Sequence, residues 1–113
     1  VIYPNMGWKP SIGTKGKLLA QSIQDELVAL GLKDRGIFYK NSTIGEKYPD
    51  GSQSDYYTVQ ISGKECGIPG VIVENAFMSN PKDLELLMDD EFKVKLAAAL
   101  CESTIQLLNK SVN

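Results

Sequence analysis

One carboxylate stands where it could do chemistry. Glu74 directly follows the apolar run Ile68–Val73, the most strand-like segment of the sequence. In sheets flanked by helices, ligands bind beyond the carboxyl ends of the strands, and we expect Glu74 to lie there. A carboxylate beside an apolar strand is partly removed from water, which suits it to general acid–base catalysis. The alternative from position alone is a structural ion pair between Glu74 and Arg35.

The lack of histidine limits the chemistry that the 113 residues can carry. Neither Ser–His nor Cys–His catalysis can occur within a chain that has no histidine. Cys66 and Cys101 form no CxxC pair, and we expect both to be ordinary, partly buried thiols. The remaining carboxylates show no spacing typical of metal ligands. No residue is therefore assigned to a metal.

Charge and hydropathy argue against two classes of partner. The chain has 12 basic and 14 acidic residues, a formal net charge of −2, and its basic residues are scattered. Nucleic acid is bound by a basic patch, which this pattern lacks. No apolar run approaches the roughly 20 residues that a membrane-spanning helix needs. We therefore expect no nucleic-acid partner and no membrane partner.

The elements that would position Glu74 include three helices. They are expected over residues 15–30, 81–88 and 90–109. In the first, Leu19, Ile23 and Leu27 repeat at helical spacing, and Thr14 is the expected N-cap. Asn80 is the expected N-cap of the second, directly before a proline.

Three strands are expected over residues 37–39, 56–62 and 68–73. The second alternates apolar and polar residues, which is the period of a half-buried strand. The third is continuously apolar, as in a strand covered on both faces. A long polar loop over 40–55 contains the turn Pro49-Asp50-Gly51. This order predicts an α/β fold, a layered domain with a mostly parallel sheet flanked by helices.

The stretch Val71–Asn80 carries a resemblance to a known family. It reads VIVENAFMSN, in which a buried strand ends in glutamate and a small residue, Phe and Ser-Asn follow. This pattern resembles the end of a zinc-dependent N-acetylmuramoyl-L-alanine amidase domain of the amidase_3 type. Asp83 and the final helix also follow the family's order, as do Arg35-Gly36 upstream. The resemblance implies that 1–113 is the C-terminal portion of one amidase-like catalytic domain, incomplete at its N-terminal side.

The resemblance also implies a role for Glu74. In this family the strand glutamate is the general base beside zinc, and it takes a proton from zinc-bound water. The resulting hydroxide attacks the amide that joins the muramoyl lactyl group to L-alanine, and Glu74 passes the proton to the leaving amine. Asn75 and Arg35 are further candidates, for substrate binding.

One feature of the family is missing from the sequence. The family's zinc is held by two histidines and a glutamate from the first half of the domain, before the part that resembles this chain. Zinc is therefore implied while its ligands are absent, and we expect the chain to be inactive in isolation. The implied partners are peptidoglycan and either the missing N-terminal half or a second copy, outside the cytoplasm at the cell wall. The alternative function is a non-catalytic module for peptidoglycan binding or assembly.

Overall fold

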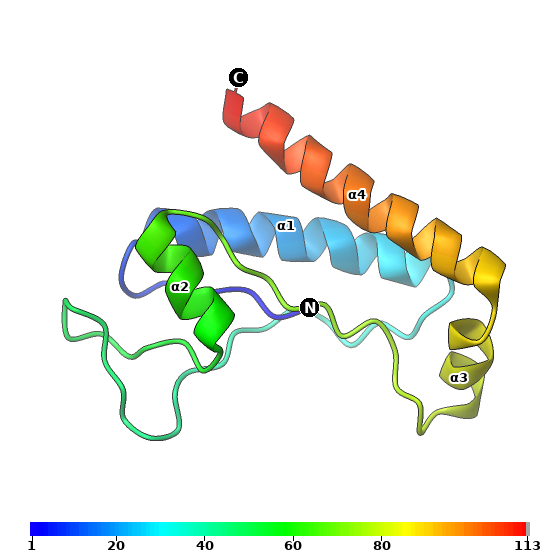
Figure 1. The fold of residues 1–113 in the computed structure, drawn as a ribbon, viewed down its shortest axis with the longest axis horizontal. Coiled ribbons are helices and arrows are strands. Elements are labelled where there is room, and N and C mark those ends of the chain that lie inside the picture. The colour runs from blue at the N-terminus through cyan, green and yellow to red at the C-terminus, as the bar shows by residue number, and fades with distance from the viewer. Residues whose placement is uncertain (113) are drawn as a thin grey trace.

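Four helices make up the regular structure of residues 1–112, the part of the chain that the computed structural model describes. They are α1 (Pro10–Ala29), α2 (Thr58–Cys66), α3 (Pro81–Leu87) and α4 (Asp90–Val112). α4 packs along α1 and contacts α3 near its own start, whereas α2 lies beside the beginning of α1 (Figure 1). The molecule is flat, with extents of 45 × 38 × 18 Å.

The expected α/β fold with a parallel sheet is wrong, because the described residues form no sheet. Three extended segments meet at Ile2, which forms a parallel bridge with Phe38 and an antiparallel bridge with Ile72. Among the described residues, the three segments pair with one another only at this residue. On the side of Ile72, pairing cannot continue because the next donor would be Pro4, which has no backbone N–H. On the side of Phe38 the next donor would be Asn5, whose backbone N–H donates to Oδ1 of Asp55 instead. The expected strands 37–39 and 68–73 are therefore reduced to isolated bridges.

α2 replaces the strand expected over 56–62. Its buried residues are Gln60 and Lys64, which are one helical turn apart and have no exposed surface. Val59, one of the residues whose alternation predicted a strand, is 58% exposed. The side of α2 that faces the protein is thus polar. The alternation of apolar residues therefore predicted a strand where the chain forms a helix.

The other helical predictions are confirmed in position, with an earlier start for α1. α1 begins at Pro10, a residue suited to the first turn of a helix because its missing N–H has no partner there. Thr14, the expected N-cap, lies inside the helix, and its Oγ1 donates to the carbonyl oxygen of Pro10 at 3.1 Å. Gly31 follows the helix with a φ of 100°, the left-handed conformation typical of this position.

The hydrophobic core lies between α1, α4 and the first extended segment. Its buried members are Val1, Tyr3, Leu19, Ala20, Ile23, Leu27, Leu32, Phe92 and Leu96. Close approach of α1 to this segment depends on glycine, because a Cβ at Gly13 would lie 2.5 Å from the carbonyl oxygen of Asn5. No helix in the described part of the chain is both long and apolar enough to cross a membrane.

Candidate functional site

A cavity of about 190 Å³ opens beside Glu74, between the end of α1 and the extended segments. Its apolar wall is formed by Val1, Leu27, Leu32, Phe38 and Phe77. Its polar and charged lining consists of Gln24, Lys33, Arg35, Glu74 and Asn75. The cavity thus combines an apolar surface with one carboxylate, two cations and two amides.

The structure brings all three candidate residues from the sequence to this cavity. Glu74, Asn75 and Arg35 line it together, although Arg35 is 39 residues away from Glu74 along the chain. Glu74 comes two residues after Ile72, whose antiparallel bridge to Ile2 holds this segment at the cavity. The expected removal of the carboxylate from water is wrong, because Glu74 is exposed. Glu74 is therefore accessible to a substrate without any rearrangement.

The guanidinium of Arg35 pairs with Asp83 and not with Glu74. Its Nη2 lies 2.9 Å from Oδ2 of Asp83, and its guanidinium carbon lies 4.3 Å from the centre of the Phe77 ring. The backbone N–H of Phe77 also donates to Oδ2 of Asp83, at 3.1 Å. This backbone hydrogen bond, followed by the one from Arg35, holds the pKa of Asp83 below its ordinary value. Arg35 is thus fixed in place, and Glu74 keeps its carboxylate available.

The N-cap of α3 places Asp83 for this contact. The Oδ1 of Asn80 accepts hydrogen bonds from the backbone N–H groups of Lys82 at 3.0 Å and Asp83 at 3.3 Å, which confirms the predicted cap. Asp83 lies in the first turn of α3, where a negative charge is also favoured by the helix dipole. The short helix therefore acts as a support for Arg35 and Phe77.

Asn75 lines the cavity, but its side-chain oxygen is enclosed by the protein. Its Oδ1 is buried and has no hydrogen-bond partner among the described residues. A buried acceptor without a donor costs about 1–3 kcal/mol. Because this oxygen has almost no accessible surface, the side chain would have to turn before the oxygen could meet a molecule in the cavity. Lys33 and Gln24, which also line the cavity, were not indicated by the sequence. Gln24 lies on α1 and Lys33 in the segment after it, and these two parts of the chain form one wall of the cavity.

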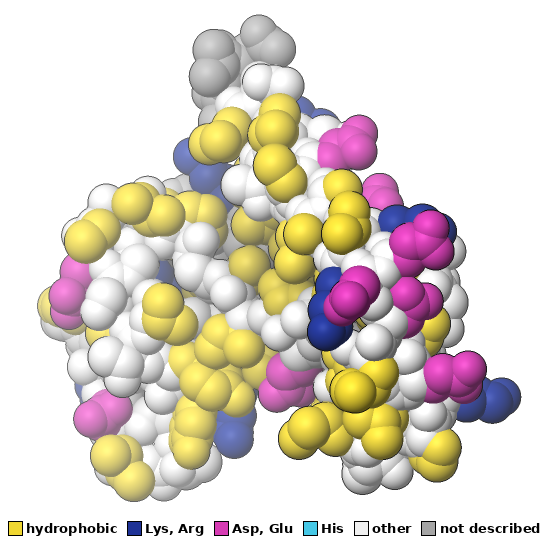
Figure 2. All heavy atoms as spheres, turned by 45° about the vertical axis from the view of Figure 1, so that its right-hand side comes forward, with side chains coloured by type: hydrophobic (Ala, Val, Ile, Leu, Met, Phe, Trp, Pro, Cys, Tyr) yellow, Lys and Arg dark blue, Asp and Glu magenta, His cyan; other side chains and the backbone are white. Residues whose placement is uncertain are grey.

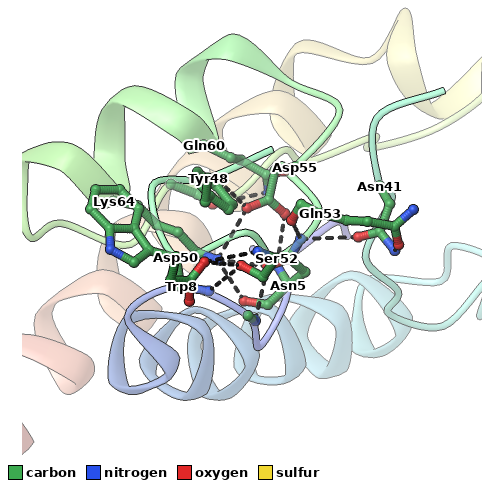
Figure 3. Close-up of polar contacts among 12 residues, drawn as sticks. Asn5, Trp8, Asn41, Tyr48, Asp50, Ser52, Gln53, Asp55, Gln60 and Lys64 are labelled. Carbon is green, nitrogen blue, oxygen red and sulfur yellow. Dashed lines mark hydrogen bonds and ion pairs between the residues drawn. The ribbon is translucent and has the colours of Figure 1, made fainter. Parts of the chain in front are cut away.

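A second cluster of polar side chains lies under α2, away from this cavity (Figure 3). Nζ of Lys64 donates to the carbonyl oxygen of Asn5 at 2.9 Å and to its Oδ1 at 2.7 Å, and lies 3.3 Å from Oδ2 of Asp55. Tyr48 donates its hydroxyl to the same carboxylate at 2.5 Å. Burial lowers the pKa of Lys64, against the effect of Asp55, and burial together with the Asp55 hydrogen bond raises the pKa of Tyr48. Because Lys64 and Asp55 have no exposed surface, we interpret the cluster as structural.

This buried cluster orders the long loop over 40–55. Two antiparallel bridges close the loop, Asn41 with Asp55 and Lys47 with Gln53. At its tip the predicted turn is confirmed, with the backbone N–H of Gly51 donating to the carbonyl oxygen of Tyr48 at 2.9 Å. No pattern in the sequence indicated this cluster, because its members come from three separate segments of the chain.

The residues around Glu74 do not fit a zinc ion. Zinc in proteins takes three or four ligands from histidine, cysteine, aspartate or glutamate. No group of three such residues comes together in the part of the chain that the structure describes, and the sequence has no histidine. Glu74 shares its cavity with Lys33 and Arg35, whose positive charges oppose the binding of a cation. The cavity therefore supplies a carboxylate but no metal-ligand set.

Comparison with known proteins identifies the family. A family model described as N-acetylmuramoyl-L-alanine amidase, Amidase_3, matches residues 8–106. No curated protein and no solved structure matches the chain. Because the family match spans most of the sequence, the chain belongs to the Amidase_3 family, which confirms the resemblance carried by Val71–Asn80. The cavity residues from Gln24 to Phe77 all lie within the matched span.

Proposed function

We propose that this member of the Amidase_3 family hydrolyses the amide between N-acetylmuramic acid and L-alanine in peptidoglycan, with Glu74 as the general base. The observation that carries the proposal is the exposed carboxylate of Glu74 at the wall of a cavity inside the family match. Because the substrate of the family is the cell wall, we propose that the protein acts there, outside the cytoplasm.

The proposed reaction uses one carboxylate twice. Glu74 takes a proton from the attacking water as the water oxygen adds to the amide carbonyl carbon. The carbon–nitrogen bond then breaks, and the proton passes from Glu74 to the departing nitrogen. The products are a carboxylate on the lactyl group and a free amino group on L-alanine. In this scheme the side chain of Asn75 turns towards the cavity so that its Oδ1 accepts a hydrogen bond from the substrate, and Arg35, held by Asp83, contacts a substrate oxygen.

The zinc implied by the family needs ligands that the described residues do not provide. We propose that the N-terminal half of an amidase domain supplies them, and that the 113 residues alone are inactive. A second copy of this chain could not replace that half, because it has no histidine either. Activity is therefore best measured on the protein in the form in which its source makes it.

The test is the release of L-alanine amino termini from purified peptidoglycan. Peptides set free by the source form are identified by mass spectrometry for the wild type and for Glu74→Gln. The matched control is Glu85→Gln, which changes an exposed glutamate outside the cavity. We expect Glu74→Gln to lower the rate at least about 100-fold, the usual contribution of a general base, and Glu85→Gln to leave it unchanged.

Two results would overturn the proposal. Full activity of Glu74→Gln would remove Glu74 from the reaction. Peptidoglycan binding by the wild type without any release of L-alanine termini would favour the alternative function, a non-catalytic module for binding or assembly. A pull-down with insoluble peptidoglycan separates binding from hydrolysis in the same samples.

A further inference from the structure

One cation of the cavity beside Glu74 has no charged partner. Lys33 lines this cavity and is exposed. Among the described residues, its ammonium group makes no ion pair and no hydrogen bond. The other cation that lines the cavity, Arg35, is matched by the carboxylate of Asp83 at 2.9 Å. Of these two cations, Lys33 is therefore the one whose charge is available to a bound anion.

The residues on either side of Lys33 fix its place in the chain. Leu32 is only 4% exposed and lines the cavity as well. On the other side, Oδ1 of Asp34 accepts hydrogen bonds from the side chain of Gln24 at 3.0 Å and from the backbone N–H of Gly36 at 2.9 Å. The carboxylate next to Lys33 in sequence is thus engaged by other groups, and the backbone that carries Lys33 is held at the cavity wall.

The surface charges do not form a broad basic field around this cation. On the face that Figure 2 shows, basic side chains (dark blue) and acidic ones (magenta) are interspersed. The chain as a whole has a formal net charge of −2. A long anionic polymer is bound by a basic patch, which this face lacks. Recognition by Lys33 is therefore local and directed at a single anionic group.

The size of the cavity limits which groups of a substrate can reach Lys33. The volume is about 190 Å³, whereas sites that enclose a whole small ligand usually measure about 300–1,000 Å³. Under the proposed function, the cavity therefore holds only the groups nearest to the amide that is cut. On the sugar side of this amide the lactyl group is uncharged. On the peptide side, the D-glutamyl residue after L-alanine carries the first ionisable group, an α-carboxyl that is free in some cell walls and amidated in others.

We propose that Lys33 binds the free α-carboxylate of this D-glutamyl residue, so that the enzyme prefers peptidoglycan in which the group is not amidated. The inference rests on the proposed function and adds a substrate preference to it. The apolar wall formed by Leu27, Leu32 and Phe77 favours the ion pair, because it reduces screening by water. An amidated residue offers a neutral carboxamide, which forms a weaker hydrogen bond with an ammonium group than a carboxylate does.

The first test compares two muramoyl tripeptides that differ only in this α-carboxyl group, free in one and amidated in the other. Peptide release by the source form is followed by mass spectrometry, and kcat/KM is determined for each substrate. We expect the wild type to prefer the free carboxylate about fivefold, the upper range for an ion pair that stays in contact with water. Lys33→Ala should bring the two values together, and Lys33→Glu should reverse the preference. The matched control is Lys47→Ala, an exposed lysine outside the cavity, which should keep the preference.

The second test restores the positive charge chemically. Cys66 and Cys101, which were expected to be partly buried, are exposed free thiols, so both are first replaced by serine. In this background Lys33→Cys should lose the preference for the free carboxylate. Alkylation of the new thiol with 2-bromoethylamine places an ammonium group at nearly the same distance from the backbone and should restore the preference. Iodoacetamide adds a neutral group to the same thiol and should not restore it.

The outcomes separate this inference from the proposed function. If the source form releases no peptide from either substrate, both proposals are overturned. Equal values of kcat/KM in the wild type, or a preference for the amidated substrate, overturn the role of Lys33 alone. So does a preference that survives Lys33→Ala, since another group would then hold the carboxylate. A preference that is lost in Lys33→Cys and restored only by the added ammonium group supports the proposal.

Discussion

Nζ of Lys64 lies 3.3 Å from Oδ2 of Asp55, and neither side chain has any exposed surface. This pair joins α2 to the end of the long loop. A buried ion pair is maintained only when further hydrogen bonds compensate for the loss of water. Here Asn5 and Tyr48 provide them, so three distant segments are held by one cluster.

Removing one partner of this pair should destabilise the protein strongly. Asp55→Ala leaves the charge of Lys64 buried without compensation, and we expect the free energy of unfolding to fall by about 3–5 kcal/mol. Urea unfolding followed by circular dichroism measures the change. Glu46→Ala, at an exposed position in the same loop, should change stability by less than about 0.5 kcal/mol. An Asp55→Ala protein as stable as the wild type would show that Asp55 is not needed to compensate the buried charge of Lys64.

Stability should fall in acid through Asp83. Its pKa is lowered in the folded protein, first by the backbone hydrogen bond from Phe77 and then by Arg35. Its stabilising contribution is therefore complete above the unfolded-state value of about 3.9 and is lost as the pH falls through the lower folded-state value. Urea midpoints measured from neutral pH into acid should decline below about pH 4. Asp83→Asn should flatten that decline, and a profile that it leaves unchanged would assign the acid sensitivity to other groups.

The cap of α3 can be tested by itself. Asn80→Ala removes the acceptor of two backbone N–H groups and should lower the free energy of unfolding by about 1 kcal/mol. Asn80→Asp keeps an oxygen at the same place and serves as the matched control. Equal losses in the two variants would show that the side-chain oxygen does not act as a cap.

The approach of α1 to the first extended segment predicts the effect of a single methyl group. In Gly13→Ala the new Cβ would meet the carbonyl oxygen of Asn5, which Lys64 also contacts. We expect a loss of about 1–3 kcal/mol from overpacking, although alanine is the better helix former. Ser11→Ala, at an exposed position in the same helix, should have little effect. A stabilised Gly13→Ala protein would show that the backbone can move apart there.

The sequence predicted those parts of the fold that depend on local signals. α1, α3 and α4 are marked by apolar spacing and, for α3, by the Asn80 cap. The prediction of a sheet was wrong because extended segments need neighbours to pair with. Each of the three segments makes only isolated bridges. The helix α2 was missed because its buried residues are Gln60 and Lys64, so its apolar residues no longer mark its inner face.

The candidate site was predictable in part for similar reasons. Glu74 and Asn75 stand out by their place after an apolar run, and the cavity gathers them with Arg35. The contact between Arg35 and Asp83 spans 48 residues, and no sequence pattern indicates such a pairing. Side-chain partners of this kind become visible only when the folded chain is known.

The flatness of the molecule has a consequence for its motions. With a shortest extent of 18 Å, few backbone amides can lie far from solvent. Protection from hydrogen exchange should therefore be concentrated in α1, which is packed between α4 and the first extended segment. Deuterium uptake followed by mass spectrometry should reach α1 last, so that this helix reports on opening of the whole chain.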